Sequence, residues 1–317
     1  MSVDSATHPA TQAVPGTSVL GTAKPHHGEK VIYILLVLAA LISVLTTVGI
    51  VISLVGNTID FFREVKIWEF LTGAEWSPLF SDPKFGVWPL INGTLLITGI
   101  AMIVAAPLGI GSAIYLSEYA RPRVRKTLKP ILEVLAGIPT IVFGYFALTY
   151  FTPDVLRDLF GVDVQVFNAL SAGIVMGFMV LPTIASVSED AMSAVPAALR
   201  EGAYGLGASK FQVSTRIVFP AALSGIVAAV VLGTSRAIGE TMIVLVAAGQ
   251  VPQTGIDPRQ AYETMTAFIA ATGKGDVPTG SIGYKTIFAV GTLLFVITFL
   301  INMISIRFVR KFRQVYE

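Results

Sequence analysis

The stretch GIVAAVVLGTSRAIGETMIVLVAAG, residues 225–249, is almost wholly apolar and yet contains two full charges, Arg236 and Glu240. An apolar run of about 20 residues is long enough to cross a lipid bilayer as a helix. The rest of the chain is similar in character: 54% of its 317 residues are hydrophobic and 13% are charged, whereas soluble domains average about 25% charged residues. The composition therefore indicates an all-α membrane protein.

Six stretches are long and apolar enough to be spanning helices. They lie at about residues 31–56, 88–116, 130–151, 167–187, 217–248 and 285–306. Within the fourth, GIVMG (residues 173–177) has the spacing of small residues that lets helices pack closely. Residues 1–28, rich in Ser, Thr, Pro, Gly and His, are expected to form a disordered cytosolic tail, and residues 29–317 a single transmembrane domain.

The distribution of Lys and Arg sets the expected orientation. If the N-terminus is cytosolic, the cytosolic segments hold 14 basic residues and the outer segments hold seven. Cytosolic loops of membrane proteins carry the excess of Lys and Arg. Both termini are therefore expected inside, with loop 188–216 in the cytosol and loop 249–284 outside.

Several classes of function are disfavoured by what the sequence lacks. There is no cysteine, and the histidines lie only in the N-terminal tail, so no thiolate or histidine metal site and no cofactor are expected in the membrane body. A net charge of +2 gives no reason to expect nucleic acid. No span carries His, Cys or Asp, which argues against an intramembrane enzyme such as a lipid-phosphate hydrolase. The chain also has no G-x-x-x-x-G-K-[ST] phosphate loop, so any ATP must be bound by another chain.

The cytosolic loop 188–216 contains signals for two short helices. Pro196 suits a first helical turn, and Gly207 is a typical helix terminator. Ser209 and Gln212 then have the spacing of a capping box, which would start a second helix that runs into the fifth span at Pro220. These signals predict a helix, a glycine turn and another helix, although an ordinary ordered loop is the alternative.

The segment REGAYGLGASKFQVSTRIVFP, residues 200–220, resembles the EAA motif of the membrane subunits of bacterial ABC importers. The matching residues are Glu201, Ala203, Gly207, Ile217 and Pro220, whereas Gly202 and Phe219 depart from the motif. The resemblance implies a type I ABC importer permease fold and a coupling helix that docks on a separate ATPase subunit. It implies that the contacts to the ATPase come from Glu201, Gly202, Ala203, Gly207, Ala208 and Ser209. A passive channel is an alternative function, but a channel would have no role for a loop that docks on an ATPase.

Arg236 lies well inside the fifth span, where a charge costs roughly 2.5–3.5 kcal/mol on insertion scales. It must therefore face protein or water. A guanidinium is a planar, permanently charged donor for an oxyanion, and Glu240, four residues on, could serve as its counter-ion. Hydroxyl groups nearby come from Thr234, Ser235 and Thr241. The alternative is a buried ion pair that only holds two helices together, although such pairs seldom offset their desolvation.

The motif RAIGET, residues 236–241, is similar to the phosphate-specific permeases of ABC importers, whose two related subunits share it. The hydrophobic residues that follow resemble the PstC type, and the resemblance covers roughly residues 31–315. It implies inorganic phosphate as substrate, a PstA-like sister permease, two PstB-like ATPase subunits, a PstS-like phosphate-binding protein, and a location in the bacterial plasma membrane. A sulfate or molybdate permease is the nearest alternative, since only the context of RAIGET favours phosphate.

Overall fold

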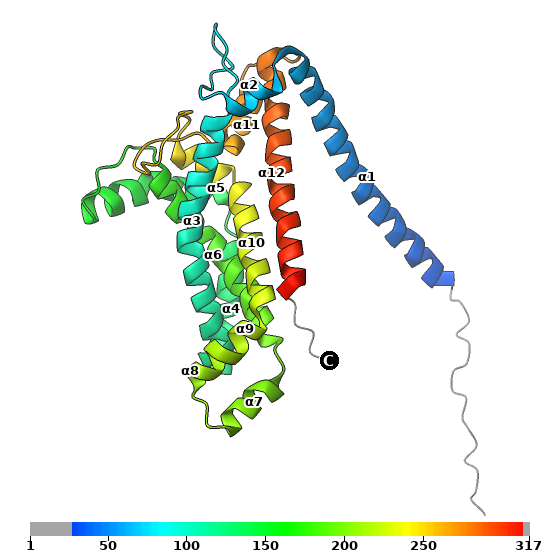
Figure 1. Cartoon of the computed structure of the whole chain (residues 1–317), viewed down its shortest axis with the longest axis vertical. Helices are drawn as coiled ribbons and strands as arrows, with labels where there is room; N and C mark the ends of the chain where they lie inside the picture. The colour runs from blue at the N-terminus through cyan, green and yellow to red at the C-terminus, as the bar shows by residue number, and fades with distance from the viewer. Residues whose placement is uncertain (1–26, 313–317) are drawn as a thin grey trace, which may run out of the picture. The chain divides into compact units, whose positions relative to one another are not determined.

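The computed structural model describes residues 27–312 and is helical through most of that range (Figure 1). The expected tail, residues 1–28, lies almost wholly outside the described residues. The α-helices are α1 (His27–Glu64), α2 (Ile67–Thr72), α3 (Trp88–Ile114), α4 (Pro122–Ala136), α5 (Thr140–Phe146), α6 (Ala169–Ser193), α7 (Ala197–Gly205), α8 (Lys210–Val213), α9 (Phe219–Ala221), α10 (Leu223–Ile238), α11 (Met265–Lys274) and α12 (Ile282–Phe312). Segments of π-helix extend or follow them: η1 (Tyr115–Tyr119), η2 (Ala147–Leu159), η3 (Ser214–Val218) and η4 (Val244–Ala248).

The chain divides into two units within α1, residues 1–52 and residues 53–317. The described part of the first unit is the first half of α1, whose side chains over residues 30–50 are exposed and almost all apolar. A helix that is apolar on every side is suited to a lipid environment. The second unit contains the remaining helices and is the part in which the candidate sites lie.

Four helices of the described chain are long and apolar enough to cross a membrane: residues 30–64, 88–119, 169–193 and 282–307. Two bent pairs of helices pass the same criteria of length and composition, over residues 122–159 and 210–238. When each bent pair is taken as one span, the described chain has six spans, which is the number expected from the sequence.

The third and fifth spans differ from the straight helices that the sequence suggested. The third is bent by 85° between α4 and α5, at a break that contains Gly137 and Pro139. Proline lacks a backbone N–H and disfavours helical geometry in the residue before it, which explains the break. The fifth bends by 71° at Ala222 and ends at Ile238, after which the chain resumes as η4. The expected single span over 217–248 is therefore wrong in its continuity.

Helix α6 occupies the centre of the second unit and packs against α3, α4, α10 and η2 (Figure 1). Glycines allow its close approach to α3. A Cβ atom on Gly173 would lie 2.7 Å from the Cβ of Ile100, and one on Gly177 would lie 2.9 Å from the carbonyl oxygen of Ala101. The prediction that GIVMG is a helix-packing motif is confirmed.

Two smaller apolar clusters hold the connections in place. One gathers aromatic side chains of the first outer loop with α11 and α12, and in it Phe61 meets both Phe70 and Phe85 edge to face at 5.6 Å. The other packs the end of α6 against the loop that follows, through Met192, Ala203 and Val213. Both loops are therefore fixed to the helices and not free segments, and α6 runs further into the predicted loop 188–216 than expected, to Ser193.

Candidate functional site

Arg236 lies where α10 contacts α6. One turn before it, a Cβ atom on Gly233 would lie 2.7 Å from Cγ1 of Ile184, so the side chain of Ile184 packs directly against the backbone of α10. Arg236 itself is half-buried, and its Nη1 donates a hydrogen bond to Oγ1 of Thr183 on α6 at 2.9 Å. A guanidinium has five N–H donors, and Thr183 is its one hydrogen-bond partner within residues 27–312. Most of its donors thus remain available.

Glu240 does not form the expected ion pair with Arg236 in the structure. Because α10 ends at Ile238, Glu240 no longer lies on the same helical face one turn further on. Its Oε1 accepts hydrogen bonds from the backbone N–H groups of Met242 at 2.9 Å and Ile243 at 3.3 Å. A carboxylate in this position caps the start of the next helical segment. Within the described residues Glu240 therefore caps the next helical segment and does not pair with Arg236.

The charge of Arg236 consequently has no counter-ion within the described chain. None of the ion pairs in residues 27–312 includes it. A charge in a membrane-spanning segment is costly when it is unpaired. Negative charge from outside the described residues would stabilise this arrangement, and free N–H donors on a guanidinium are well suited to an oxyanion.

The three hydroxyl residues of the predicted site have separate partners. Thr234 donates to the carbonyl oxygen of Val230 at 2.9 Å, within its own helix. Ser235 donates to Oδ1 of Asn302 on α12 at 3.1 Å and so joins α10 to the last span. Thr241 has a long contact of 3.4 Å to the carbonyl oxygen of Gly239. None of the three hydrogen-bonds the guanidinium in the described chain.

A cluster of buried threonines, which was not predicted from the sequence, lies beside Glu240. Thr266 donates to the carbonyl oxygen of Glu240 at 2.6 Å and lies 3.1 Å from the hydroxyl of Thr264. Thr94 on α3 accepts a hydrogen bond from the backbone of Met265 at 3.1 Å. The three threonines line a narrow crevice together with Glu240. Threonines in apolar stretches were a possible signal, but only the fold brings α3, α11 and the end of α10 together.

The cytosolic loop has the local structure that its sequence predicts. Helix α7 is followed by Gly207 in a left-handed conformation, with φ of +80°. Ser209 and Gln212 form the predicted capping box, with hydrogen bonds of 3.3 Å and 2.8 Å in the two directions. Of the residues assigned to ATPase contact, Ala203 is buried, Ala208 is half-buried, and the others, Glu201, Gly202, Gly207 and Ser209, are exposed.

Arg200 connects α7 to the membrane helices, a role that was not predicted from the sequence. Its guanidinium donates to Oε1 of Glu118 in η1 at 3.0 Å, to the carbonyl oxygen of Val195 at 2.6 Å and to that of Met192 at 2.8 Å. The Glu118 side chain is 4% exposed and that of Arg200 is 20% exposed. This largely desolvated pair connects α7 to α6 and, through η1, to α3.

The turn after α7 presents apolar side chains to the surroundings. Leu206 is 91% exposed, Phe211 is 68% exposed and Tyr204 is 43% exposed. Large apolar side chains that gather on a loop outside the predicted spans are typical of a protein-contact surface.

Comparisons with known proteins agree with this architecture. The family model described as "Binding-protein-dependent transport system inner membrane component" matches residues 105–314. The chain is 37% identical over 278 residues to a probable ABC transporter permease protein, YqgH, of Bacillus subtilis, covering 87% of this chain and 89% of the relative. It is 32% identical over 287 residues to the phosphate transport system permease protein PstC of Mesorhizobium japonicum, covering 84% and 85%.

Solved structures show the same fold. A bacterial ABC transporter involved in the import of the acidic polysaccharide alginate superposes with a TM-score of 0.64 at 16% identity, over 90% of this chain and 98% of that one. The MetNI methionine ABC transporter gives a TM-score of 0.54 at 21% identity, over 72% and 95%. The chain therefore belongs to the binding-protein-dependent transport system inner membrane component family, as a multi-pass permease of an ABC importer that is similar to the PstC phosphate permeases.

Proposed function

We propose that this chain is the permease subunit of an ATP-driven importer of inorganic phosphate in the bacterial plasma membrane. In this proposal residues 29–317 form the transmembrane permease domain, which lines half of the translocation pathway and pairs with a PstA-like sister permease. The observation that carries the proposal is the half-buried guanidinium of Arg236, which has free donors and no carboxylate of the described chain beside it.

The proposed anion contact is built on Arg236 and Thr183. The hydrogen bond to Thr183 orients the guanidinium from one nitrogen and leaves the remaining donors for a bidentate contact with two of the four oxygens of a phosphate. Hydroxyl groups in the same segment would come from Thr234, Ser235 and Thr241. Glu240 would stabilise the non-helical residues after α10 by capping the next turn. The relatives named as phosphate permeases support phosphate over other oxyanions.

The proposed coupling site is α7 with the turn that follows it. Glu201, Gly202, Ala203, Gly207, Ala208 and Ser209 would form the part that meets the ATPase. The exposed apolar side chains of Leu206 and Phe211 suit a cleft on such a partner. The contact of Arg200 with Glu118 and with the end of α6 would pass movement of α7 to the spanning helices. Two PstB-like ATPase subunits and a PstS-like phosphate-binding protein complete the proposed transporter.

Uptake into proteoliposomes tests this proposal. The chain is reconstituted with its sister permease, ATPase and binding protein, with ATP enclosed, and the uptake of radiolabelled phosphate is measured. We expect uptake that requires both ATP and the binding protein and that is unaffected by excess sulfate or molybdate. Inhibition by sulfate or molybdate, with transport of that anion, would instead identify a related oxyanion importer.

A further inference from the structure

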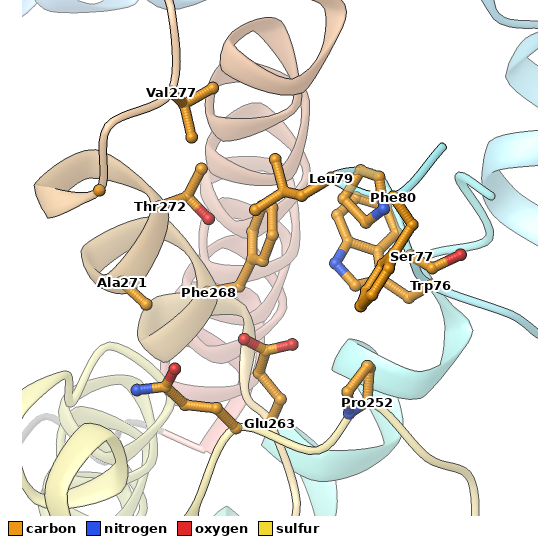
Figure 2. Close-up of a pocket in the computed structure, with 13 residues that line it drawn as sticks. Trp76, Ser77, Leu79, Phe80, Pro252, Glu263, Phe268, Ala271, Thr272 and Val277 are labelled. Carbon is orange, nitrogen blue, oxygen red and sulfur yellow. The ribbon is translucent and has the colours of Figure 1, made fainter. Parts of the chain in front are cut away.

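A pocket of about 290 Å³ lies in the part of the chain expected to face outward, between the first outer loop and α11 (Figure 2). Its walls are mostly apolar or aromatic, and Glu263 is its one charged lining residue in the described chain. The apolar walls include Trp76, Leu79, Phe80, Pro252, Phe268, Ala271 and Val277. Figure 2 shows the carboxylate of Glu263 pointing into this space, below the rings of Phe268 and Trp76.

Glu263 is a buried carboxylate that has no polar partner among the described residues. The residue is only 7% exposed, and within residues 27–312 its side chain takes part in no hydrogen bond or ion pair. Burial accordingly raises the pKa of this carboxyl, which lies outside the membrane-spanning segments, from about 4.5 to about 7. A buried charge is stabilised by pairing with an opposite charge, so a cation that entered this pocket would stabilise the ionised carboxylate.

The backbone holds Glu263 rigidly at this position. Its N–H donates to the carbonyl oxygen of Val251 at 2.9 Å. Its own carbonyl oxygen lies so close to α3 that a Cβ atom on Gly93 would approach it to 2.3 Å. The opposite wall is also fixed, because the backbone of Ser77 donates to Lys84 at 2.9 Å and Trp76 contacts the ring of Phe268 edge to face at 4.9 Å. The pocket is therefore preformed.

Aromatic walls around a carboxylate select a particular kind of cation. Ammonium and guanidinium groups are attracted to the faces of aromatic rings and to a carboxylate alike. The aliphatic stem of a lysine or arginine also packs well against apolar walls, while its charged end reaches the polar group. Lys84 of this chain does not fill the pocket, because it pairs with Asp82 at 3.1 Å, and Asp82 is itself exposed.

The rim of the pocket has the features of a protein contact. Phe80 is 76% exposed and Leu79 is 53% exposed, although both lie in an outer loop and not in a spanning helix. The family to which the chain belongs is defined by dependence on a binding protein. We propose that the pocket receives a lysine or arginine side chain of the substrate-binding protein when that protein docks on the outer face. The proposal rests on the proposed importer function in so far as it needs a binding protein.

Docking to the whole transporter in lipid nanodiscs tests the proposal. The affinity of the system's own binding protein is measured for the wild type and for Glu263→Gln, about one unit above and about one unit below the pKa of Glu263. For the wild type we expect tighter docking at the higher pH, because a bound cation stabilises the carboxylate. For Glu263→Gln we expect roughly tenfold weaker docking at the higher pH and loss of the pH dependence.

Glu75→Gln is the matched control, because Glu75 is an exposed carboxylate in the same loop that does not line the pocket. Phe80→Ala, at the exposed rim, is expected to weaken docking several-fold without changing its pH dependence. Basal ATPase activity confirms that each variant assembles. Docking of Glu263→Gln that equals the wild type at both pH values would overturn the proposal.

Ethylguanidinium separates a protein side chain from a free small cation as the occupant. We expect it to weaken docking of the binding protein competitively in the wild type and to have no effect on Glu263→Gln. If it binds the pocket but leaves docking unchanged, the pocket serves a free cation and the proposal is wrong. Failure of the proposed function is distinct, because the wild-type transporter would then not take up phosphate, whatever the docking result.

Discussion

Arg236 on α10 donates a hydrogen bond to Thr183 on α6 at 2.9 Å, and this is the one polar contact of its guanidinium within residues 27–312. The contact joins two helices at the point where Gly233 brings their surfaces together. It orients a charge that the described chain does not neutralise. The role of this hydrogen bond can be tested by replacing either the donor, Arg236, or the acceptor, Thr183.

Replacement of Arg236 by Gln should almost abolish phosphate uptake. Gln keeps some of the length and polarity but removes the charge and the planar pair of donors, so uptake should fall by roughly a hundredfold while the complex still assembles. Arg63→Gln is the control, since Arg63 is largely exposed and pairs with Asp60 at the surface. Radiolabelled uptake in proteoliposomes provides the measurement, and normal uptake by Arg236→Gln would refute a role in the pathway.

Replacement of Thr183 by Val should raise the KM for transport while the charge remains. The guanidinium loses the hydrogen bond that orients it, and a hydrogen bond to a charged group contributes about 1.5–3 kcal/mol. We therefore expect uptake at low substrate concentration to fall roughly tenfold and to recover in part at high concentration. An unchanged concentration dependence would mean that Thr183 does not position Arg236 for the anion.

Replacement of Gly207 by Lys should separate ATP hydrolysis from transport. Gly207 has φ of +80°, which L-residues rarely adopt, so the variant strains the turn and also adds a charge to the proposed ATPase contact. Gly161→Lys is a matched control, because Gly161 has φ of +65° and open space around it but lies outside the loop. ATPase activity and uptake are measured on the same vesicles. Equal coupling ratios in both variants would contradict the docking role.

Replacement of Glu118 by Gln should weaken coupling without loss of the fold. Arg200 would keep its hydrogen bonds to Val195 and Met192 but lose the charged partner in η1. We expect several-fold less phosphate transported for each ATP hydrolysed, since removing one partner of a nearly buried pair leaves the other uncompensated. Glu64→Gln, which removes a more exposed pair with Lys285, serves for comparison. The same loss in both variants would point to general destabilisation.

The stability of the protein should depend on pH through Glu263. Its pKa is about 7 in the folded protein, against an ordinary value near 4.5. Between these two pH values the carboxyl is therefore protonated in the folded protein and ionised in the unfolded chain. Stability contributed by this group therefore falls as the pH rises from about 4.5 through about 7. Glu263→Gln should be the more stable protein above that range, by on the order of 3 kcal/mol.

Thermal unfolding of the purified complex at several pH values measures this effect. The difference in Tm between Glu263→Gln and wild type should grow with pH and level off above the pKa. Glu75→Gln, which alters an exposed carboxylate, should show no such growth. A difference that does not depend on pH would mean that Glu263 titrates normally in the folded protein.

The sequence predicted those parts of the structure that depend on neighbouring residues. The capping box of Ser209 and Gln212 and the left-handed Gly207 involve positions a few residues apart, and both are confirmed. The close packing of α6 on α3 also follows from the spacing of Gly173 and Gly177. In each case the physical cause lies within one segment of the chain.

The features that depend on distant segments were missed or wrongly predicted. Hydropathy measures how apolar a stretch is but not whether its helix is continuous, so the break after Ile238 was not foreseen. Glu240 was placed on the same helical face as Arg236 for the same reason. The break after Ala136 is different, because its cause, Pro139, is local. Thr183 and Glu263 carry no local signal, because their roles arise from a helix contact and from the burial of an outer loop.

The chain bends by 71° at Ala222, between the helical segment that ends at Ala221 and α10. Arg236 lies 14 residues beyond Ala222, so at about 1.5 Å per residue it is about 21 Å from the bend. A tilt of α10 by only about 5° about this bend would displace the guanidinium by about 2 Å, enough to break its hydrogen bond to Thr183. Spin-label distances between α6 and the end of α10, with and without ATP, would detect such a tilt. A small rotation at the cytosolic end of the helix would then move Arg236, near the other end, and change its contact with an anion.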